Sequence, residues 1–296
     1  MKQRFETGRA AYKYPPMTHT PTAQPKLFDR KALAANRARR QLGALFLHEM
    51  ARNEVEDRLA LVNRVFTAPA VVTPFAEVWT EGLSGSLAGA KLVPDDDVLG
   101  LEPGAHDLVI HSMGLHWAND PVGQLIQCRR ALKEDGLLLT VLLGGQTLQE
   151  LRVALAGAES EVLGGLSPRI APMGEVRDLG ALLQRAGFAL PVADVVPLTA
   201  EYRDLMHLMH ELRAMGEANA LEARLRRPVP RRLFTRAEEI YRAHFETKEG
   251  RLPASFELIC LTGWSPSDRQ QKPLRPGSAQ MRLADALKVP ETKLPD

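Results

Sequence analysis

A chain of 296 residues is long for one domain and short for two large ones, and its 45% hydrophobic and 25% charged residues are ordinary for a globular protein. The net charge of +2 argues against a broad surface for nucleic acid, and no apolar run approaches the ~20 residues that a membrane span requires. Cys128 and Cys260 lack metal-ligand spacing and indicate buried thiols in a reducing compartment.

Residues 1–26 combine prolines with Lys, Arg and Thr and show no apolar periodicity, which predicts a mobile N-terminal extension. This segment has no apolar core for a secretory signal, and it has no serine, in which organelle transit peptides are rich. We therefore expect a bacterial cytoplasmic protein. A peripheral position at the inner membrane stays open as an alternative.

Two helices are predicted over residues 27–63, ahead of the sheet. Asp29 can cap the first helix, and the second extends from about Ala44 to Asn63 on an apolar face. The sheet core follows over residues 64–264. In its first part, Arg64–Thr67 and Ala90–Val93 are strand candidates, and Val71–Glu81 is predicted to be helical.

The prediction of the fold centres on residues 106–145. Asp107–His111 is a β-branched apolar run typical of a buried strand, and Leu137–Leu143 is a second one. Between them, Asn119-Asp120-Pro121 offers an N-cap and a first-turn proline for a helix over 121–134. Strand, helix and strand in this order predict two adjacent parallel strands.

Ligands of open α/β sheets bind outside the carboxyl ends of the strands. The predicted ends are His111-Ser112-Met113 and Gly144-Gly145, which places the loop Leu115-His116-Trp117 over a cleft. A packed loop whose tryptophan shields the end of the sheet is the alternative, because a loop histidine and tryptophan need not do chemistry.

The second half of the chain alternates helical and extended patterns. Residues 201–250 form a predicted helical insert in the sheet core, and the tail 265–296 is expected to be loose apart from 279–287. The predicted helices are Gln146–Leu163, Met173–Ala186, Tyr202–Met215 and Arg232–Phe245, and the predicted strands are Phe188–Val196 and Phe256–Leu261.

A series of short motifs occurs in order along residues 27–264. The motifs are Asp107-Leu-Val-Ile, Leu115-His116-Trp117-Ala-Asn119-Asp120, Gln127 to Gly136, Gly144-Gly145-Gln146-Thr147-Leu148, Gly165-Leu-Ser167-Pro168-Arg169, Arg177-Asp178-Leu179-Gly180, Arg185-Ala-Gly187-Phe188 and Met215-Gly216-Glu217-Ala-Asn219. Together they resemble the complex I assembly-factor branch of the class I S-adenosylmethionine-dependent methyltransferases. Phe28-Asp29-Arg30 also resembles the malonyl-carrier-protein methyltransferases of biotin synthesis.

The resemblance implies an α/β, three-layer Rossmann-like methyltransferase fold with a mostly parallel sheet, and S-adenosylmethionine as cofactor. It also implies a role in assembly or maturation of respiratory complex I, the NADH dehydrogenase. The assembly-factor branch is thought to hydroxylate an arginine of a complex I subunit, so the implied reaction is either methylation or hydroxylation.

The sequence departs from the family where the cofactor is held. Such enzymes use a glycine-rich turn after the first strand and an acid after the second, but this chain has no glycine between Gly43 and Gly82, and Pro69 removes a backbone N–H. Only 22 residues, 68–89, separate the first two strand candidates, enough for one helical crossover. We therefore expect a shortened first half that lacks one strand, its helix and the ribose acid. Alternatively, Glu77 or Glu81 replaces that acid.

Two functions stay open. In an S-adenosylmethionine enzyme, the candidate catalytic residues are His116, His111 and Asp120, and the candidate cofactor contacts are Asp96, Asp97, Ser112 and Met113. In a non-catalytic assembly protein with a decayed pocket, Trp117 is the candidate contact with a protein partner, expected to be a complex I subunit. Nucleic-acid binding through the arginines of 224–232 is disfavoured because no aromatic residues are interleaved for stacking.

Overall fold

The computed structural model describes residues 26–80 and 85–270 and the single residues 281, 285 and 288. Most of the predicted N-terminal extension and of the helix expected over 279–287 lies outside the described residues. The α-helices are α1 (Arg30–Arg37), α2 (Phe46–Leu61), α3 (Glu77–Thr80), α4 (Pro121–Ala131), α5 (Gln149–Leu163), α6 (Val176–Arg185), α7 (Leu205–Met215) and α8 (Arg231–Phe245). The strands are β1 (Pro69–Val72), β2 (Lys91–Val93), β3 (His106–Ser112), β4 (Leu132–Leu143), β5 (Ala189–Tyr202) and β6 (Leu252–Trp264).

The six strands form one sheet in the order β2-β1-β3-β4-β6-β5. The first four strands in this order are parallel, whereas β6 runs antiparallel to both β4 and β5. The central prediction is confirmed, because β3 and β4 are parallel neighbours joined by α4, with Val109 opposite Leu138. The mostly parallel, Rossmann-like α/β fold is confirmed with it.

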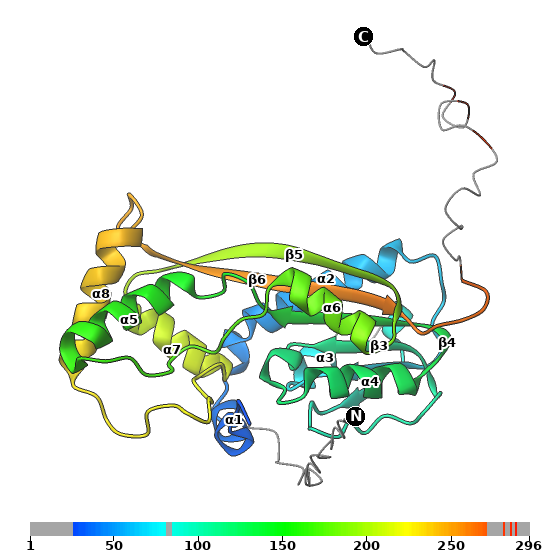
Figure 1. Ribbon diagram of the computed structural model, residues 1–296, viewed down its shortest axis with the longest axis horizontal. Coiled ribbons are helices and arrows are strands. Elements are labelled where there is room, and N and C mark those ends of the chain that lie inside the picture. Colours follow the sequence, from blue (N-terminus) through cyan, green and yellow to red (C-terminus); the bar gives the residue numbers. More distant parts are fainter. Residues whose placement is uncertain (1–25, 81–84, 271–280, 282–284, 286–287, 289–296) are drawn as a thin grey trace, which may run out of the picture.

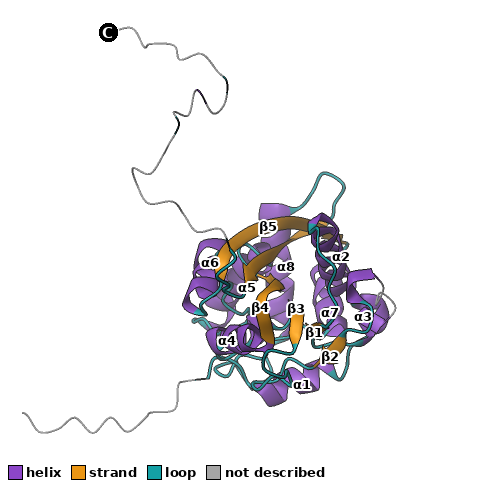
Figure 2. Ribbon diagram, turned by 90° about the vertical axis from the view of Figure 1, so that its right-hand side faces the viewer, coloured by secondary structure: helices purple, strands orange, loops and turns teal. Residues whose placement is uncertain are grey.

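Helices cover both faces of the sheet, which makes three layers (Figure 2). Alternate residues of β3 face opposite layers, as the pleat of a strand requires. Leu108 and Ile110 belong to the core that includes residues of α2, α5, α7 and α8, whereas Val109 packs with residues of α4 and α6. Both faces of the central strands are therefore buried, which is why their sequences are continuously apolar.

The predicted helix caps form as expected. The Asp29 carboxylate accepts from the Ala32 N–H at 3.0 Å at the start of α1, and the Asp120 carboxylate accepts from the Gly123 N–H at 2.8 Å at the start of α4. The helix predicted over 121–134 ends earlier than expected. Helix α4 stops at Ala131, and β4 begins directly at Leu132.

The predicted first strand is wrong by five residues. The strand is Pro69–Val72, buried at every position, and not Arg64–Thr67. A proline is tolerated at the first residue of a strand, where its missing N–H breaks no inner ladder bond. The helix expected over Val71–Glu81 shrinks to α3, because Val71 and Val72 pair with β2 and β3.

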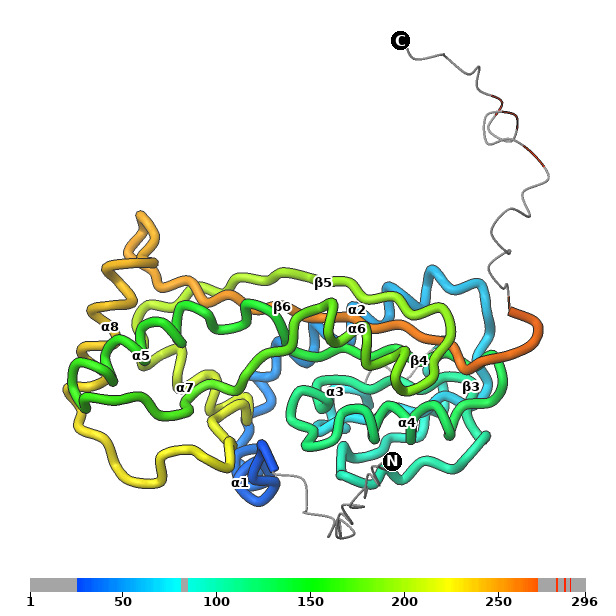
Figure 3. Tube along the Cα trace, viewed as in Figure 1, coloured from blue at the N-terminus to red at the C-terminus, as the bar shows by residue number. Residues whose placement is uncertain are grey.

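The last two strands are much longer than predicted. β5 and β6 pair antiparallel along most of their lengths, from Val192 opposite Thr262 to Tyr202 opposite Leu252, and they run the length of the molecule (Figure 3). Pro191 does not end β5, because β5 is the edge strand and its register shifts between Ala189 and Val192. Their far ends carry α5, α7 and α8 beyond the parallel part of the sheet (Figure 1).

The shortened first half is also observed among the described residues. β2 pairs directly with β1, and the described part of the connection between them, residues 73–80 and 85–90, contains only α3 and a 3₁₀ turn, Gly85–Leu87. Glu81, the alternative ribose acid, lies outside the described residues. No helix in the described part of the chain is long and apolar enough to cross a membrane.

Candidate functional site

The four parallel strands end at one edge of the sheet, where ligands of such folds bind. β1 leads into Thr73-Pro74-Phe75, β2 into Pro94-Asp95, β3 into Met113 and β4 into Gly144-Gly145. The side chains at this edge decide what the cleft can hold.

Side chains close the turn after β1. The Thr73 N–H already donates to the carbonyl at the end of β2 at 2.9 Å, and Pro74 has no N–H to offer. Phe75 is 1% exposed; its ring centre lies 4.7 Å from that of His48 and 5.1 Å from the Arg40 guanidinium carbon. The turn therefore lacks the glycines that let the backbone approach a ligand closely.

Helix α1 covers the end of β2. The Arg37 guanidinium donates from Nη1 to both oxygens of buried Asp95, at 2.8 and 3.0 Å, and Arg30 donates to the Asp95 carbonyl at 2.6 Å. Asp96 and Asp97, two of the candidate cofactor contacts, are exposed and lie 3.9 and 3.7 Å from Arg30. The buried acid of this turn is thus bound within the protein.

S-adenosylmethionine, which the resemblance implies, does not fit the residues at this edge. A phenyl ring stands where a glycine turn is needed, and the most buried acid is neutralised by Arg37. A ligand that approached β1 and β2 would have to displace Phe75 from the core and α1 from its ion pairs.

The three candidates at the end of β3 are fully buried. His111 shares a hydrogen bond with the Gln124 side chain, between Nε2 and Oε1 at 2.9 Å, and burial lowers its pKa. The Ser112 hydroxyl has no hydrogen-bond partner in the described part of the chain. Met113 has φ +53°, a strained conformation for a bulky residue, and its N–H donates to the Val141 carbonyl at 2.7 Å. These side chains belong to the sheet interior.

The loop over the cleft is tied to a buried carboxylate, Glu217. The Trp117 indole N–H donates to Glu217 Oε2 at 2.7 Å, and His116 Nε2 lies 3.4 Å from the same oxygen. His48 of α2 lies 3.8 Å from the other oxygen, Oε1. Although burial opposes ionisation, the hydrogen bond from His116 and the nearby His48 imidazole hold the pKa of Glu217 well below its ordinary value. Burial lowers the pKa of His48, so we treat that imidazole as neutral at pH 7.

The N-terminal segment holds the same loop from the other side. The Phe28 and Trp117 rings meet edge to face with centres 5.0 Å apart, and the Asn119 side chain bonds both backbone groups of Phe28, at 2.9 and 3.1 Å. Trp117 is 4% exposed as a result. Asp120, by contrast, is exposed at the start of α4 and only caps that helix. The structure therefore brings His116 and Trp117 together but leaves His111 in the sheet and Asp120 outside.

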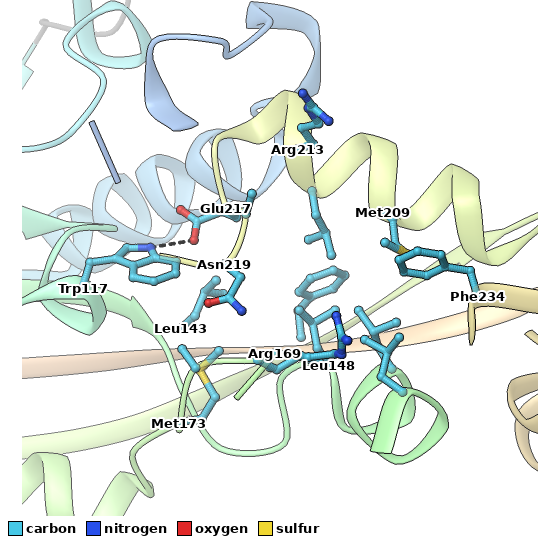
Figure 4. Close-up of a pocket in the computed structure, with 17 residues that line it drawn as sticks. Trp117, Leu143, Leu148, Arg169, Met173, Met209, Arg213, Glu217, Asn219 and Phe234 are labelled. Carbon is cyan, nitrogen blue, oxygen red and sulfur yellow. Dashed lines mark hydrogen bonds between the residues drawn. The ribbon is translucent and has the colours of Figure 1, made fainter. Parts of the chain in front are cut away.

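A cavity of about 220 Å³ opens beside this carboxylate (Figure 4). It lies between the ends of β4 and β6 and the helices α5, α7 and α8. Most of its walls are apolar, and its polar residues are Arg169, Arg213, Glu217 and Asn219. None of the side chains that close the β1 edge lines this cavity.

Sequence reasoning missed the residues that make this site. Glu217 stands in the motif Met215-Gly216-Glu217-Ala-Asn219, whose resemblance was visible, but nothing in the sequence places it 100 residues away against Trp117. Arg37 and His48 lie in the two helices predicted ahead of the sheet, and nothing in the sequence singled out either residue for the site. The one sequence feature that could have pointed to Glu217 is its place between small residues, directly after the glycine that ends a helix.

The buried histidines predict acid sensitivity. His48 and His111 have lowered pKa values in the fold, so below the unfolded value of about 6.5 the unfolded chain binds more protons and stability falls. Between pH 7.5 and 5.5 we expect each histidine to remove up to about 1 kcal/mol from the free energy of unfolding. Urea unfolding across this range measures the loss, and His111→Asn should reduce the slope. A pH-independent stability contradicts the expectation.

Comparison with known proteins identifies the relatives of the chain. A scan against protein-family models finds no match. The chain is 36% identical over 198 residues to the protein named "Arginine-hydroxylase NDUFAF5, mitochondrial" of Danio rerio, covering 67% of this chain and 61% of that protein. To the Homo sapiens protein of that name it is 35% identical over 199 residues, covering 67% and 57%. To the malonyl-[acyl-carrier protein] O-methyltransferase of Laribacter hongkongensis it is 35% identical over 190 residues, covering 64% and 61%.

The chain thus spans about six-tenths of the length of the curated relatives it matches. Among solved structures, a methyltransferase of Bacillus halodurans matches 71% of this chain and 97% of its own length with a TM-score of 0.44 and 14% identity. The sequence relatives carry the conclusion: over about two thirds of its length the chain is a homologue of the proteins named NDUFAF5 and of the malonyl-[acyl-carrier protein] O-methyltransferases.

Proposed function

We propose that this methyltransferase-like protein acts in assembly or maturation of respiratory complex I, by binding a complex I subunit rather than by turning over S-adenosylmethionine. The relatives named NDUFAF5 support the proposed role in complex I assembly. One observation carries the non-catalytic part: Phe75 and the Arg37–Asp95 ion pair occupy the edge of the sheet that a cofactor requires.

The proposal extends to organisation and location. We take residues 27–264 as the functional domain, with 201–250 as its helical insert, and the cytoplasm as its location. Both cysteines, Cys128 and Cys260, are free, as is usual in a reducing compartment, and burial raises the pKa of both thiols to about 12. Trp117 remains the proposed contact with the partner, which reaches it through the cavity that the indole lines.

A second candidate is an enzyme, and the Glu217 cluster is the observation that favours it. A buried carboxylate and an imidazole, Glu217 and His116, stand next to a cavity, which is the arrangement expected of an acid–base pair. The relatives' printed name makes arginine hydroxylation the reaction to consider, an oxidation for which an oxidant such as O₂ would have to supply the oxygen atom, while Glu217 and His116 would only move a proton. On this reading His116→Gln abolishes the modification of the partner but leaves its binding intact.

Deletion of the gene tests the proposal. We expect cells without the protein to accumulate less fully assembled NADH dehydrogenase on a native gel, and the wild-type chain to restore it. A double variant, Asp96→Asn with Asp97→Asn, removes both exposed candidate cofactor contacts and should restore assembly equally well. Unchanged assembly in the deleted strain refutes the role, and failure of the double variant alone points to the enzymatic candidate.

A further inference from the structure

The cavity beside Glu217 has the walls of an apolar binding site. Its lining includes Leu143 at the end of β4, Leu151 and Leu155 of α5, Leu212 of α7 and Phe256 of β6. An apolar cavity of ~150 Å³ stays dry and holds a benzene molecule. A cavity of about 220 Å³ therefore has room for an apolar group of about eight carbons.

One charged side chain on this wall has an unused hydrogen-bond donor. Arg169 donates from Nη2 to Glu159 Oε1 at 2.8 Å, but its Nε–H is buried and has no partner in the described part of the chain. Figure 4 shows Arg169 inside the cavity, across from Glu217, whereas Arg213 points away from it. A buried donor without an acceptor destabilises the protein, so an anionic group that accepts a hydrogen bond from this Nε–H would be bound favourably.

The carboxylate on the other side of the cavity has more partners. Glu217 Oε2 already receives the Trp117 indole N–H and lies against His116, whereas Oε1 has no hydrogen bond in the described part of the chain and faces His48 Nε2 at 3.8 Å. A cationic ligand would have to displace His48 from Oε1, whereas an anionic ligand meets the unsatisfied Nε–H of Arg169. The charge distribution favours an anion at Arg169.

We infer that this cavity binds an aliphatic monocarboxylate, with an alkyl chain of about eight carbons against α5, α7 and β6 and the carboxylate at Arg169. The site does not require S-adenosylmethionine and goes beyond the proposed role in complex I assembly, although Trp117, the proposed partner contact, lines the same cavity. Its ligand is recognised by apolar burial together with one charge-assisted hydrogen bond.

Titration calorimetry of the full chain with sodium octanoate tests the site. Octanoate should bind at least about tenfold more tightly than octylammonium or 1-octanol, because only the carboxylate gives Arg169 a charge-assisted hydrogen bond. Arg169→Gln should weaken octanoate binding at least about tenfold and leave octanol binding unchanged. Arg152→Gln is the matched control, since Arg152 lines neighbouring hollows but not this cavity, and should retain wild-type affinity.

A cavity-filling variant provides a second test of the site in case Arg169→Gln does not fold. Met209→Trp fills the space from α7 and should abolish binding of both octanoate and octanol, while thermal melting shows that the chain is folded. The inference is overturned if octanoate does not bind the wild type, if octylammonium or octanol binds as tightly, or if Arg152→Gln loses as much affinity as Arg169→Gln.

Discussion

Trp117→Ala should lower the free energy of unfolding by about 3–5 kcal/mol, the range for a large buried aromatic. The indole is 4% exposed, meets Phe28 edge to face and donates to Glu217. Truncation opens a cavity at the sheet end and leaves a buried carboxylate without its shortest hydrogen bond. Chemical denaturation monitored by circular dichroism measures the loss.

Trp117→Phe is the matched control for this change. It keeps an apolar ring against Phe28 but removes the N–H, so we expect a smaller loss of about 1–3 kcal/mol, because Glu217 Oε2 then keeps only the longer contact with His116. If Trp117→Ala instead keeps full stability and costs more than about 2 kcal/mol of partner affinity, the indole is an interface hot spot and not a plug. Full stability together with full partner binding removes Trp117 from the site.

Arg37→Met should be equally damaging, by about 3–5 kcal/mol, because it leaves a buried charge without its close partner. Asp95 is almost completely buried, Arg37 Nη1 contacts both of its oxygens, and only the Arg30 guanidinium, 3.9 Å from Oδ2, would remain. Helix α1 would then be held to the end of β2 by Arg30 alone among these contacts. Thermal and urea unfolding of the variant give the size of the effect.

A double variant separates the ion pair from the packing of α1. Arg37→Met combined with Asp95→Asn removes both charges and should recover a large part of the stability lost by Arg37→Met alone. Additive losses in this double-mutant cycle mean that the two side chains do not interact, and that α1 does not hold the β2 edge through them.

Local patterns predicted the centre of the fold well, because its signals are local. Continuous apolar runs, the Asp120 cap and Pro121 lie within forty residues of one another and determine a βαβ unit. The first strand was misplaced because Arg64–Thr67 and Pro69–Val72 are both short apolar runs. Only pairing with β2 and β3 distinguishes them.

The candidate site was predicted less well, because long-range contacts build it. The sequence showed that the glycine turn after the first strand is missing. It did not show that Phe75 and α1 would fill the space at that edge of the sheet. The catalytic candidate His116 and the partner-contact candidate Trp117 lie against one carboxylate, Glu217, which comes from the end of α7 and which the sequence did not indicate. Asp120 illustrates the reverse error of interpretation, since a cap residue near a predicted cleft need not face it.

Titration of the wild-type chain with S-adenosylmethionine tests the central claim most directly. With Phe75 in the turn after β1 and Asp95 bound to Arg37, we predict a dissociation constant above ~100 μM, or less than about 5.5 kcal/mol of binding free energy. Isothermal titration calorimetry at pH 7.5 measures it, with S-adenosylhomocysteine as the second ligand. Low-micromolar binding of either compound contradicts the claim that this protein works without the cofactor of its superfamily.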